Sequence, residues 1–279
     1  MRIVADAKEL AQALAAAGRV VPRRPTYPIL GNVLLEAGEK ATIRATDLET
    51  QLILDLDCIV EEPGQMLPPA GVLTGLVPRL NGQVRVVGDG DKGLIEWDSG
   101  QVSVPLAHPD SYPAPITVAE AVPVPVNVAK AAQYVVPFAD PDAAYQPIFG
   151  GVYVEAGEGK LAAVATDTHR MAVLEWDYAD EDVQALIPAR AWETAVKLGA
   201  KQLFVGRGAV WFVGQGVDLT VRQIEGKYPN WRTVWPKELP TWVAVDGRLL
   251  AVLERAMVVA NLAEKDGADV VGLALQDGE

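Results

Sequence analysis

Residues 164–173 read Val-Ala-Thr-Asp-Thr-His-Arg-Met-Ala-Val, an apolar stretch interrupted by a polar run that contains Asp167, His169 and Arg170. The apolar flanks are typical of buried strand ends, so the polar run is predicted to be the turn between two strands. A shorter version, Ala-Thr-Asp-Leu-Glu-Thr, occupies residues 45–50, 120 residues earlier. The chain therefore carries the same strand–turn–strand signal twice.

The two turns belong to a longer internal repeat. Further matches follow in the same order: Pro-Ile-Leu-Gly at 28–31 and Pro-Ile-Phe-Gly at 147–150, Glu-Ala-Gly-Glu at 36–39 and 155–158, Pro-Ala at 69–70 and 188–189, and Tyr-Pro at 112–113 and 228–229. A period near 120 residues is too long for a solenoid, so each copy should be a domain with its own core. The predicted domains are residues 1–120, residues 121–240, and a partial, truncated third copy at 241–279.

Hydrophobic periodicity and turn residues predict a mixed α+β chain. Helices are expected at 5–20, 69–80, 128–138, 188–198 and 246–262, with Asp6 as the N-cap of the first and the prolines at 22 and 25 ending it. Strands are expected at 29–35, 41–46, 51–60, 84–87, 93–97, 102–106, 148–155, 161–166, 171–176, 202–205, 209–213, 217–223 and 271–278. The proline-rich residues 112–125 are predicted to be a linker.

Composition excludes several classes of protein. Half of the residues are hydrophobic, which supports a sizeable core, and the single cysteine, Cys58, is interpreted as a small buried side chain in a reducing compartment. The N-terminus lacks the features of a signal peptide, and no apolar stretch approaches the ~20 residues that cross a bilayer. The net charge of −13 argues against a surface coated for nucleic acid, although basic residues gather on the helices and at their ends.

Three interpretations of the second turn stand side by side. Asp167 and His169 could act as acid and base, but no paired nucleophile accompanies them. Asp167 could instead cap the backbone amides of its own turn. The turn could also form the rim of a binding pocket, because it places polar groups beside apolar strands. Two histidines and one cysteine far apart in the chain make no metal cluster, and no phosphate-binding glycine motif is present.

Four stretches together resemble the bacterial DNA polymerase III beta subunit family, the sliding clamps. They are Arg24–Asn32, Thr46–Glu49, Val164–Val173 and Tyr228–Arg232, and their order and spacing match over nearly the whole chain. The resemblance implies an α+β DNA-clamp fold. In this fold, repeated β-α-β-β-β units place helices on the inner face of a central hole and antiparallel sheets outside.

The resemblance also implies a function. Clamps are non-catalytic processivity factors of the cytoplasm and nucleoid that encircle duplex DNA without reading its sequence, and they need no cofactor or metal. They tether the replicative polymerase, the clamp loader and repair proteins, whose short hydrophobic motifs enter one pocket per subunit. Carried over by position, the peptide pocket consists of Phe149, Thr166, Thr168, His169, Arg170, Met171, Pro229 and Val234. The implied DNA contacts are Arg24, Arg23, Arg79, Lys197 and Lys201.

The chain departs from the family pattern at several positions. Thr168 stands where the family usually has glycine, Thr233 where some members have arginine, and Pro147 and Ile148 where some have tyrosines that contact DNA. Self-association into a ring is expected only if the third domain is complete. A clamp-like paralogue that binds proteins without encircling DNA is therefore the alternative function, and a hydrolase that uses Asp167 and His169 is the third.

Overall fold

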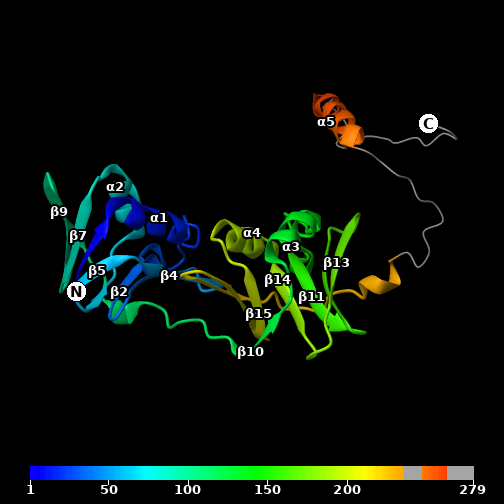
Figure 1. The fold of residues 1–279 in the computed structure, drawn as a ribbon, viewed down its shortest axis with the longest axis horizontal. Coiled ribbons are helices and arrows are strands. Elements are labelled where there is room, and N and C mark those ends of the chain that lie inside the picture. The colour runs from blue at the N-terminus through cyan, green and yellow to red at the C-terminus, as the bar shows by residue number, and fades with distance from the viewer. Residues whose placement is uncertain (236–246, 263–279) are drawn as a thin grey trace. The chain divides into compact units, whose positions relative to one another are not determined.

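The computed structural model describes residues 1–235 and 247–262, with side chains described to residue 256 in the second range. The chain divides into two compact units, residues 1–229 and residues 230–279. The first predicted repeat and residues 121–229 of the second lie in the first unit, and Figure 1 shows their helices and strands.

The first repeat contains two helices and nine strands. Its elements are β1 (Arg2–Asp6), α1 (Ala7–Ala17), β2 (Leu34–Ala37), β3 (Ala41–Thr46), β4 (Thr50–Leu56), β5 (Cys58–Glu62), β6 (Gly64–Met66), α2 (Ala70–Leu76), β7 (Gln83–Asp89), β8 (Lys92–Trp97) and β9 (Gly100–Pro105). The short 3₁₀ helices η1 (Pro28–Gly31), η2 (Val77–Arg79) and η3 (Pro109–Ser111) connect them.

The second repeat follows the same order without a counterpart of β5. Its elements are β10 (Ala119–Val124), α3 (Val128–Tyr134), β11 (Gly151–Gly157), β12 (Lys160–Thr166), β13 (Met171–Asp177), β14 (Gln184–Pro188), α4 (Ala189–Lys197), β15 (Gln202–Arg207), β16 (Ala209–Gly214) and β17 (Val217–Arg222). The 3₁₀ helices η4 (Val136–Phe138) and η5 (Pro147–Gly150) complete it. The predicted internal repeat is thus a repeat of structure.

The strands form three antiparallel sheets, whose strand orders are β5-β1-β7-β8-β9, β10-β15-β16-β17-β4-β3-β2-β6 and β13-β12-β11-β14. The second sheet runs through both repeats, because β17 pairs with β4 from Val217 opposite Leu54 to Val221 opposite Thr50. In Figure 1 the helices α1 to α4 lie on the same side of these sheets. The fold is therefore of the α+β class that the sequence predicts.

The first helix shows how local sequence sets an element and its burial. The Asp6 side chain accepts a hydrogen bond from the Lys8 backbone N–H at 2.9 Å, which confirms it as the N-cap. Leu10 and Leu14, four residues apart, are buried against the sheets. Burial of each such side chain contributes about 1.5–3 kcal/mol. Trp192 of α4 is fully buried in the same cluster, with its ring 5.2 Å from that of Phe212.

Several predicted boundaries are wrong for identifiable reasons. The first helix starts after strand β1 and ends at Ala17, before the prolines that were expected to end it. The expected strands at 29–35 and 148–155 each begin instead with a 3₁₀ helix, because Pro28 and Pro147 fix the backbone at its first position. The last part of the predicted linker forms β10, and β6 and β14 were not predicted.

The expected strand at 51–60 divides at Asp57 into β4 and β5. Cys58 begins β5 and is only half-buried, so its prediction as a buried side chain holds in part. Burial and the neighbouring carboxylate of Asp57 raise the pKa of its thiol.

The second unit contains η6 (Trp231–Thr233) and α5 (Gly247–Leu262), which confirms the predicted helix at 246–262. The rings of Trp231 and Trp235 also contact each other there, with centroids 6.2 Å apart. The strand predicted at 271–278 lies outside the described residues. None of the helices in the described ranges is both long and apolar enough to cross a membrane.

Candidate functional site

The second turn, residues 166–170, is held by side chains that bond to its own backbone. The Thr166 hydroxyl donates to the Arg170 carbonyl oxygen at 2.7 Å and accepts from the Thr168 N–H at 3.0 Å. Asp167 Oδ1 accepts from the N–H groups of His169 and Arg170 at 3.0 and 2.9 Å. The predicted capping role of Asp167 is therefore confirmed.

Arg170 makes an ion pair within the turn and reaches beyond it. Its Nε donates to Asp167 Oδ2 at 2.9 Å, its Nη2 donates to the Pro137 carbonyl oxygen at 3.1 Å, and its guanidinium lies 5.2 Å from the centre of the Phe138 ring. Desolvation acts to raise the pKa of Asp167, but the hydrogen bonds from Arg170 and His169 outweigh it and lower that pKa to about 2. Asp167 is thus a fixed anion at neutral pH and a poor proton carrier.

The first turn, residues 46–50, repeats this hydrogen-bond set. The Thr46 hydroxyl donates to the Thr50 carbonyl oxygen at 2.8 Å and accepts from the Leu48 N–H at 3.0 Å. Asp47 Oδ1 accepts from the N–H groups of Glu49 and Thr50 at 3.1 and 2.6 Å. The Thr-Asp pair therefore specifies one turn geometry at two places in the chain.

The central residue of each turn has a left-handed backbone. Leu48 has φ of 78° and Thr168 has φ of 74°. This region is unfavourable for residues with a side chain, and most of all for β-branched ones such as threonine. The structure thereby gives a physical reason for the glycine that the family usually has at the position of Thr168.

The two turns differ in what holds the aspartate from outside. In the first turn, Asp47 Oδ2 lies 3.5 Å from Nη2 of Arg190, which belongs to the second repeat. Arg222, also from the second repeat, donates from its Nε to the Leu48 carbonyl oxygen at 3.0 Å and from its backbone N–H to the Glu49 carbonyl oxygen at 2.8 Å. The first turn is therefore bonded to the neighbouring repeat, whereas Asp167 is paired by an arginine of its own turn.

An aromatic wall stands beside the second turn. Tyr228 stacks on Tyr153 with ring centroids 4.8 Å apart, and Phe149 meets the Tyr228 ring edge-on at 6.2 Å. Burial raises the pKa of Tyr228 to about 12, and the nearby Thr166 backbone acts weakly in the opposite direction. The buried Tyr228 hydroxyl lacks a hydrogen-bond partner of normal geometry among the described residues.

The residues predicted to form the peptide pocket fall into three groups. Thr166, Thr168, His169, Arg170 and Met171 lie together in the turn and at the start of β13, and Met171 is half-buried opposite Thr166. Phe149 is linked to the turn through Tyr228 and is followed in the chain by β11, while Pro229 is exposed next to Tyr228. Val234 belongs to the second unit, where it is 72% exposed.

The residues predicted to contact DNA are all exposed and lie near helices. Arg23 and Arg24 lie between α1 and η1, and Lys201 follows α4. Arg79 donates to the Gly75 carbonyl oxygen at the end of α2. Lys197 lies 3.5 Å from Glu193, one turn earlier on α4.

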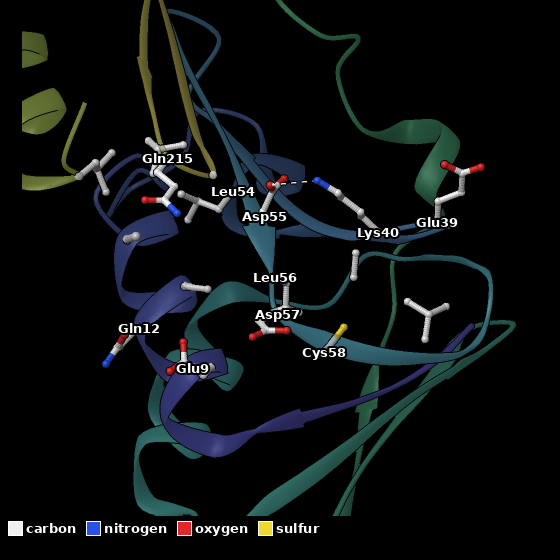
Figure 2. Close-up of a pocket in the computed structure, with 18 of the residues that line it drawn as sticks. Glu9, Gln12, Glu39, Lys40, Leu54, Asp55, Leu56, Asp57, Cys58 and Gln215 are labelled. Carbon is white, nitrogen blue, oxygen red and sulfur yellow. Dashed lines mark ion pairs between the residues drawn. The ribbon is translucent and has the colours of Figure 1, made fainter. Parts of the chain in front are cut away.

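A cleft of about 1400 Å³ lies where α1, the β2–β3 turn, the end of β4 and the β16–β17 turn meet. Figure 2 shows its side chains, including the ion pair of Lys40 with Asp55 at 3.9 Å. Its carboxylates, from Glu9, Glu39, Asp55 and Asp57, outnumber its lysines, Lys40 and Lys197. Such a wall repels phosphate, so this cleft does not itself suit the DNA backbone.

Metal-binding groups do not gather in the described residues: no cluster of three or more His, Cys, Asp or Glu side chains could hold an ion there.

Comparison with known proteins names the family. Residues 1–116 match the model of the N-terminal domain of the DNA polymerase III beta subunit, and residues 124–230 match the model of its central domain. The chain is 30% identical to the beta sliding clamp of Synechocystis sp., over 94% of this chain and 76% of that protein. The chain belongs to the beta sliding clamp family. The resemblance inferred from the four sequence stretches is therefore confirmed.

Solved structures of sliding clamps share the fold of this clamp. The beta subunit from Streptococcus pyogenes superposes with a TM-score of 0.85 at 18% identity, covering 95% of this chain and 76% of that one. A Pseudomonas aeruginosa DnaN sliding clamp bound to griselimycin superposes with a TM-score of 0.80 at 22% identity, covering 92% and 74%. Both confirm the predicted DNA-clamp fold.

Sequence reasoning missed several residues that hold the clamp's two turns. Arg190 and Arg222 reach the first turn from the second repeat, and Arg222 lies 174 residues from its acceptor Leu48. No local pattern indicates contacts over that distance. Tyr153 could have been found, because it follows the matched Pro-Ile-Phe-Gly segment and occupies the repeat position of the buried Leu34.

Proposed function

We propose that this protein is a non-catalytic processivity factor that encircles duplex DNA and tethers the replicative polymerase to it. Membership of the beta sliding clamp family is the observation that carries the proposal. A clamp of this kind retains DNA by topology, so it needs only weak, sequence-independent contacts with phosphate. A net charge of −13 suits that role better than tight binding through a basic surface.

The proposed DNA-facing residues are the exposed cations near the helices: Arg23, Arg24, Arg79, Lys197 and Lys201. The proposed organisation has three domains, at 1–120, 121–240 and from 241 onward. Strand pairing like that between β17 and β4 is the proposed means of ring closure. β9 and β13 are the outermost strands of their sheets, so each could pair with a strand of another domain. Action on chromosomal DNA implies a place in the cytoplasm, at the nucleoid.

The proposed peptide pocket lies at the second turn. Arg170 and Met171 offer a fixed donor beside an apolar side chain, and Phe149 and Tyr228 add an aromatic wall. Such a surface suits the short hydrophobic motifs of the polymerase, the clamp loader and repair proteins. Pro229 and Val234 complete the proposed residue set.

Peptide binding tests the pocket directly. A fluorescein-labelled peptide from the C-terminus of a bacterial replicative polymerase is titrated with the full chain and followed by anisotropy. Met171→Asp should weaken binding at least tenfold, because it places a charge on the apolar wall, and Arg170→Ala should weaken it less. Ile59→Asp is the matched control, since Ile59 is 66% exposed on β5 in the first repeat. Unchanged binding by Met171→Asp would place the peptide elsewhere.

Topological retention tests the clamp itself. The protein is incubated with a bacterial clamp loader, ATP and a nicked circular plasmid, and the DNA-bound fraction is isolated by gel filtration. The protein should stay with the circle and leave after a single cut linearises it. Equal retention on the linear plasmid would show ordinary DNA binding, and no retention on either would favour a protein-binding paralogue that does not encircle DNA.

A further inference from the structure

A cavity of about 1070 Å³ lies beside the first turn, between the two repeats of the first unit. One wall comes from the first repeat and includes Leu48, Glu49 and Ile116. The opposite wall comes from the second repeat and includes Arg190, Arg222 and Ile224. The cavity therefore exists only because the repeats are joined.

Its first wall is the internal counterpart of the proposed peptide pocket. Thr46, Leu48, Glu49 and Thr50 occupy the repeat positions of Thr166, Thr168, His169 and Arg170, and Pro113 occupies that of Pro229. These five residues all line the cavity. The remaining counterparts of the pocket residues do not line it: Leu30 and Gln51, in place of Phe149 and Met171, are buried.

The chemistry of the walls selects the kind of ligand. Leu48, Ile116 and Ile224 provide apolar surface, while two arginines and two glutamates, Arg190, Arg222, Glu49 and Glu225, balance each other in charge. The glutamates would repel a phosphate backbone, which excludes nucleic acid. Apolar surface with both fixed donors and fixed acceptors fits an extended peptide, whose backbone offers N–H and C=O groups on either side of an apolar side chain.

The walls are also preorganised. Arg222 fixes the Leu48 and Glu49 carbonyl groups, and Arg190 pairs with Asp47. On the linker side, the Ile116 N–H donates to Gln51 Oε1 at 3.0 Å. A site whose walls are already tied loses little entropy when a ligand enters.

We propose that this cavity is a second peptide-binding site, which takes a short extended peptide of no net charge that carries a leucine or phenylalanine side chain. The choice of a peptide as its ligand rests on the proposed function of the second turn. The location of the cavity and the residues that line it are independent of that proposal. A clamp with both sites could hold two partner segments on one subunit.

Methyl NMR separates the two sites in one experiment. The full chain is labelled at the Leu, Ile and Met methyl groups and titrated with acetylated pentapeptides that have Leu or Phe at alternate positions and no net charge. Leu48, Ile116 and Ile224 report on the cavity, and Met171 reports on the proposed pocket at the second turn. We expect saturable shifts of the methyl signals of Leu48, Ile116 and Ile224.

Substitutions at Leu48 test whether those shifts come from the cavity. Leu48→Asn and Leu48→Asp should weaken the response of Ile116 and Ile224 at least tenfold while the Met171 response persists, and both side chains tolerate the left-handed backbone at this position. Val72→Asp is the control, because Val72 on α2 is 39% exposed, close to the 36% of Leu48, and does not line the cavity.

The outcomes distinguish this proposal from the proposed function. Shifts at Met171 alone would overturn the cavity as a peptide-binding site and leave the proposed function standing. Shifts at Leu48, Ile116 and Ile224 alone would support the cavity as a peptide-binding site and remove the pocket assignment at the second turn. If neither site responds, both assignments fail for this class of peptide.

Discussion

The two Thr-Asp turns have one backbone geometry and two surroundings. Asp47 and Asp167 each accept two backbone N–H groups, and Leu48 and Thr168 each adopt a left-handed φ near 75°. Asp167 is paired by an arginine of its own turn, whereas Asp47 is paired by Arg190 of the next repeat. The comparison teaches that the Thr-Asp sequence fixes the turn, while the position of the arginine that pairs with its aspartate decides whether the turn is held from within or from the next repeat.

Removal of the capping aspartates should give the largest effect. Asp47→Ala and Asp167→Ala each leave two turn amides without their acceptor, so each should lower the free energy of unfolding by about 2 kcal/mol in urea titrations. Hydrogen exchange should separate the two variants. Asp47→Ala should speed exchange in the β4–β17 ladder, and Asp167→Ala should not. Equal acceleration in that ladder would contradict the different roles of the turns.

Relief of the left-handed backbone should give a smaller, opposite effect. Thr168→Gly should raise the free energy of unfolding by about 1 kcal/mol, because the loss of strain exceeds the entropy that glycine adds to the unfolded chain. Leu48→Gly should raise it by about half as much, since leucine is not β-branched. A destabilised Thr168→Gly variant in thermal or urea unfolding would show that the hydroxyl or methyl group makes a contact that offsets the strain.

Tyr112 and Tyr228 occupy equivalent positions in the two repeats, but loss of their hydroxyl groups should change stability by different amounts. The Tyr112 hydroxyl can donate a hydrogen bond to the carbonyl oxygen of Asn32 at 3.3 Å or to that of Arg44 at 3.5 Å. Tyr112→Phe should therefore lower the free energy of unfolding by about 1 kcal/mol. Tyr228→Phe should change stability by less than about 0.5 kcal/mol, because its hydroxyl gives up no hydrogen bond of normal geometry to the described residues. Equal losses from the two substitutions would show that Tyr228 is bonded in solution.

Protonation of Asp167 at low pH should produce the smallest change in stability. The pKa of Asp167 is about 2 in the folded chain, below its ordinary value near 4, so the ionised carboxylate stabilises the fold above pH 4 and this contribution is lost as the pH falls to 2. The stability difference between the native chain and Asp167→Asn should therefore narrow between pH 4 and pH 2. A difference that stays constant over that range would contradict the lowered pKa. The exposed partner Arg170 keeps the effect modest.

The sequence could predict elements whose signals are local. Strand β3 matches its predicted bounds, and the cap at Asp6 and the turn at Asp167 follow from side chains that bond nearby backbone. In the segments that were assigned wrongly, an apolar run that favours a strand competes with a proline that favours a 3₁₀ turn. Pro28 and Pro147 sit in apolar runs that resemble strands, but their fixed φ favours 3₁₀ turns.

The rest of the candidate site depends on contacts between distant residues. The family resemblance assigns Arg170 and Met171 to a predicted pocket rim, because they lie inside the motif itself, and that assignment stays a prediction. It could not show that Arg222 would bond to Leu48 or that Arg190 would pair with Asp47, since these contacts join residues more than 140 positions apart that meet where β17 pairs with β4. Short strands such as β6 and β14 carry too few residues to show an alternating pattern.

The β17–β4 ladder bears on how such a chain can change over generations. Its pairing from Val217 opposite Leu54 to Val221 opposite Thr50 uses main-chain groups, which every amino acid except proline supplies alike. Because side chains such as Leu52 and Leu219 are buried there, the joint should tolerate exchanges between side chains of similar size and polarity without disconnecting the repeats. That tolerance fits a fold kept at a TM-score of 0.85 with a relative only 18% identical, and it leaves the surface free to drift toward new partners while the joint persists.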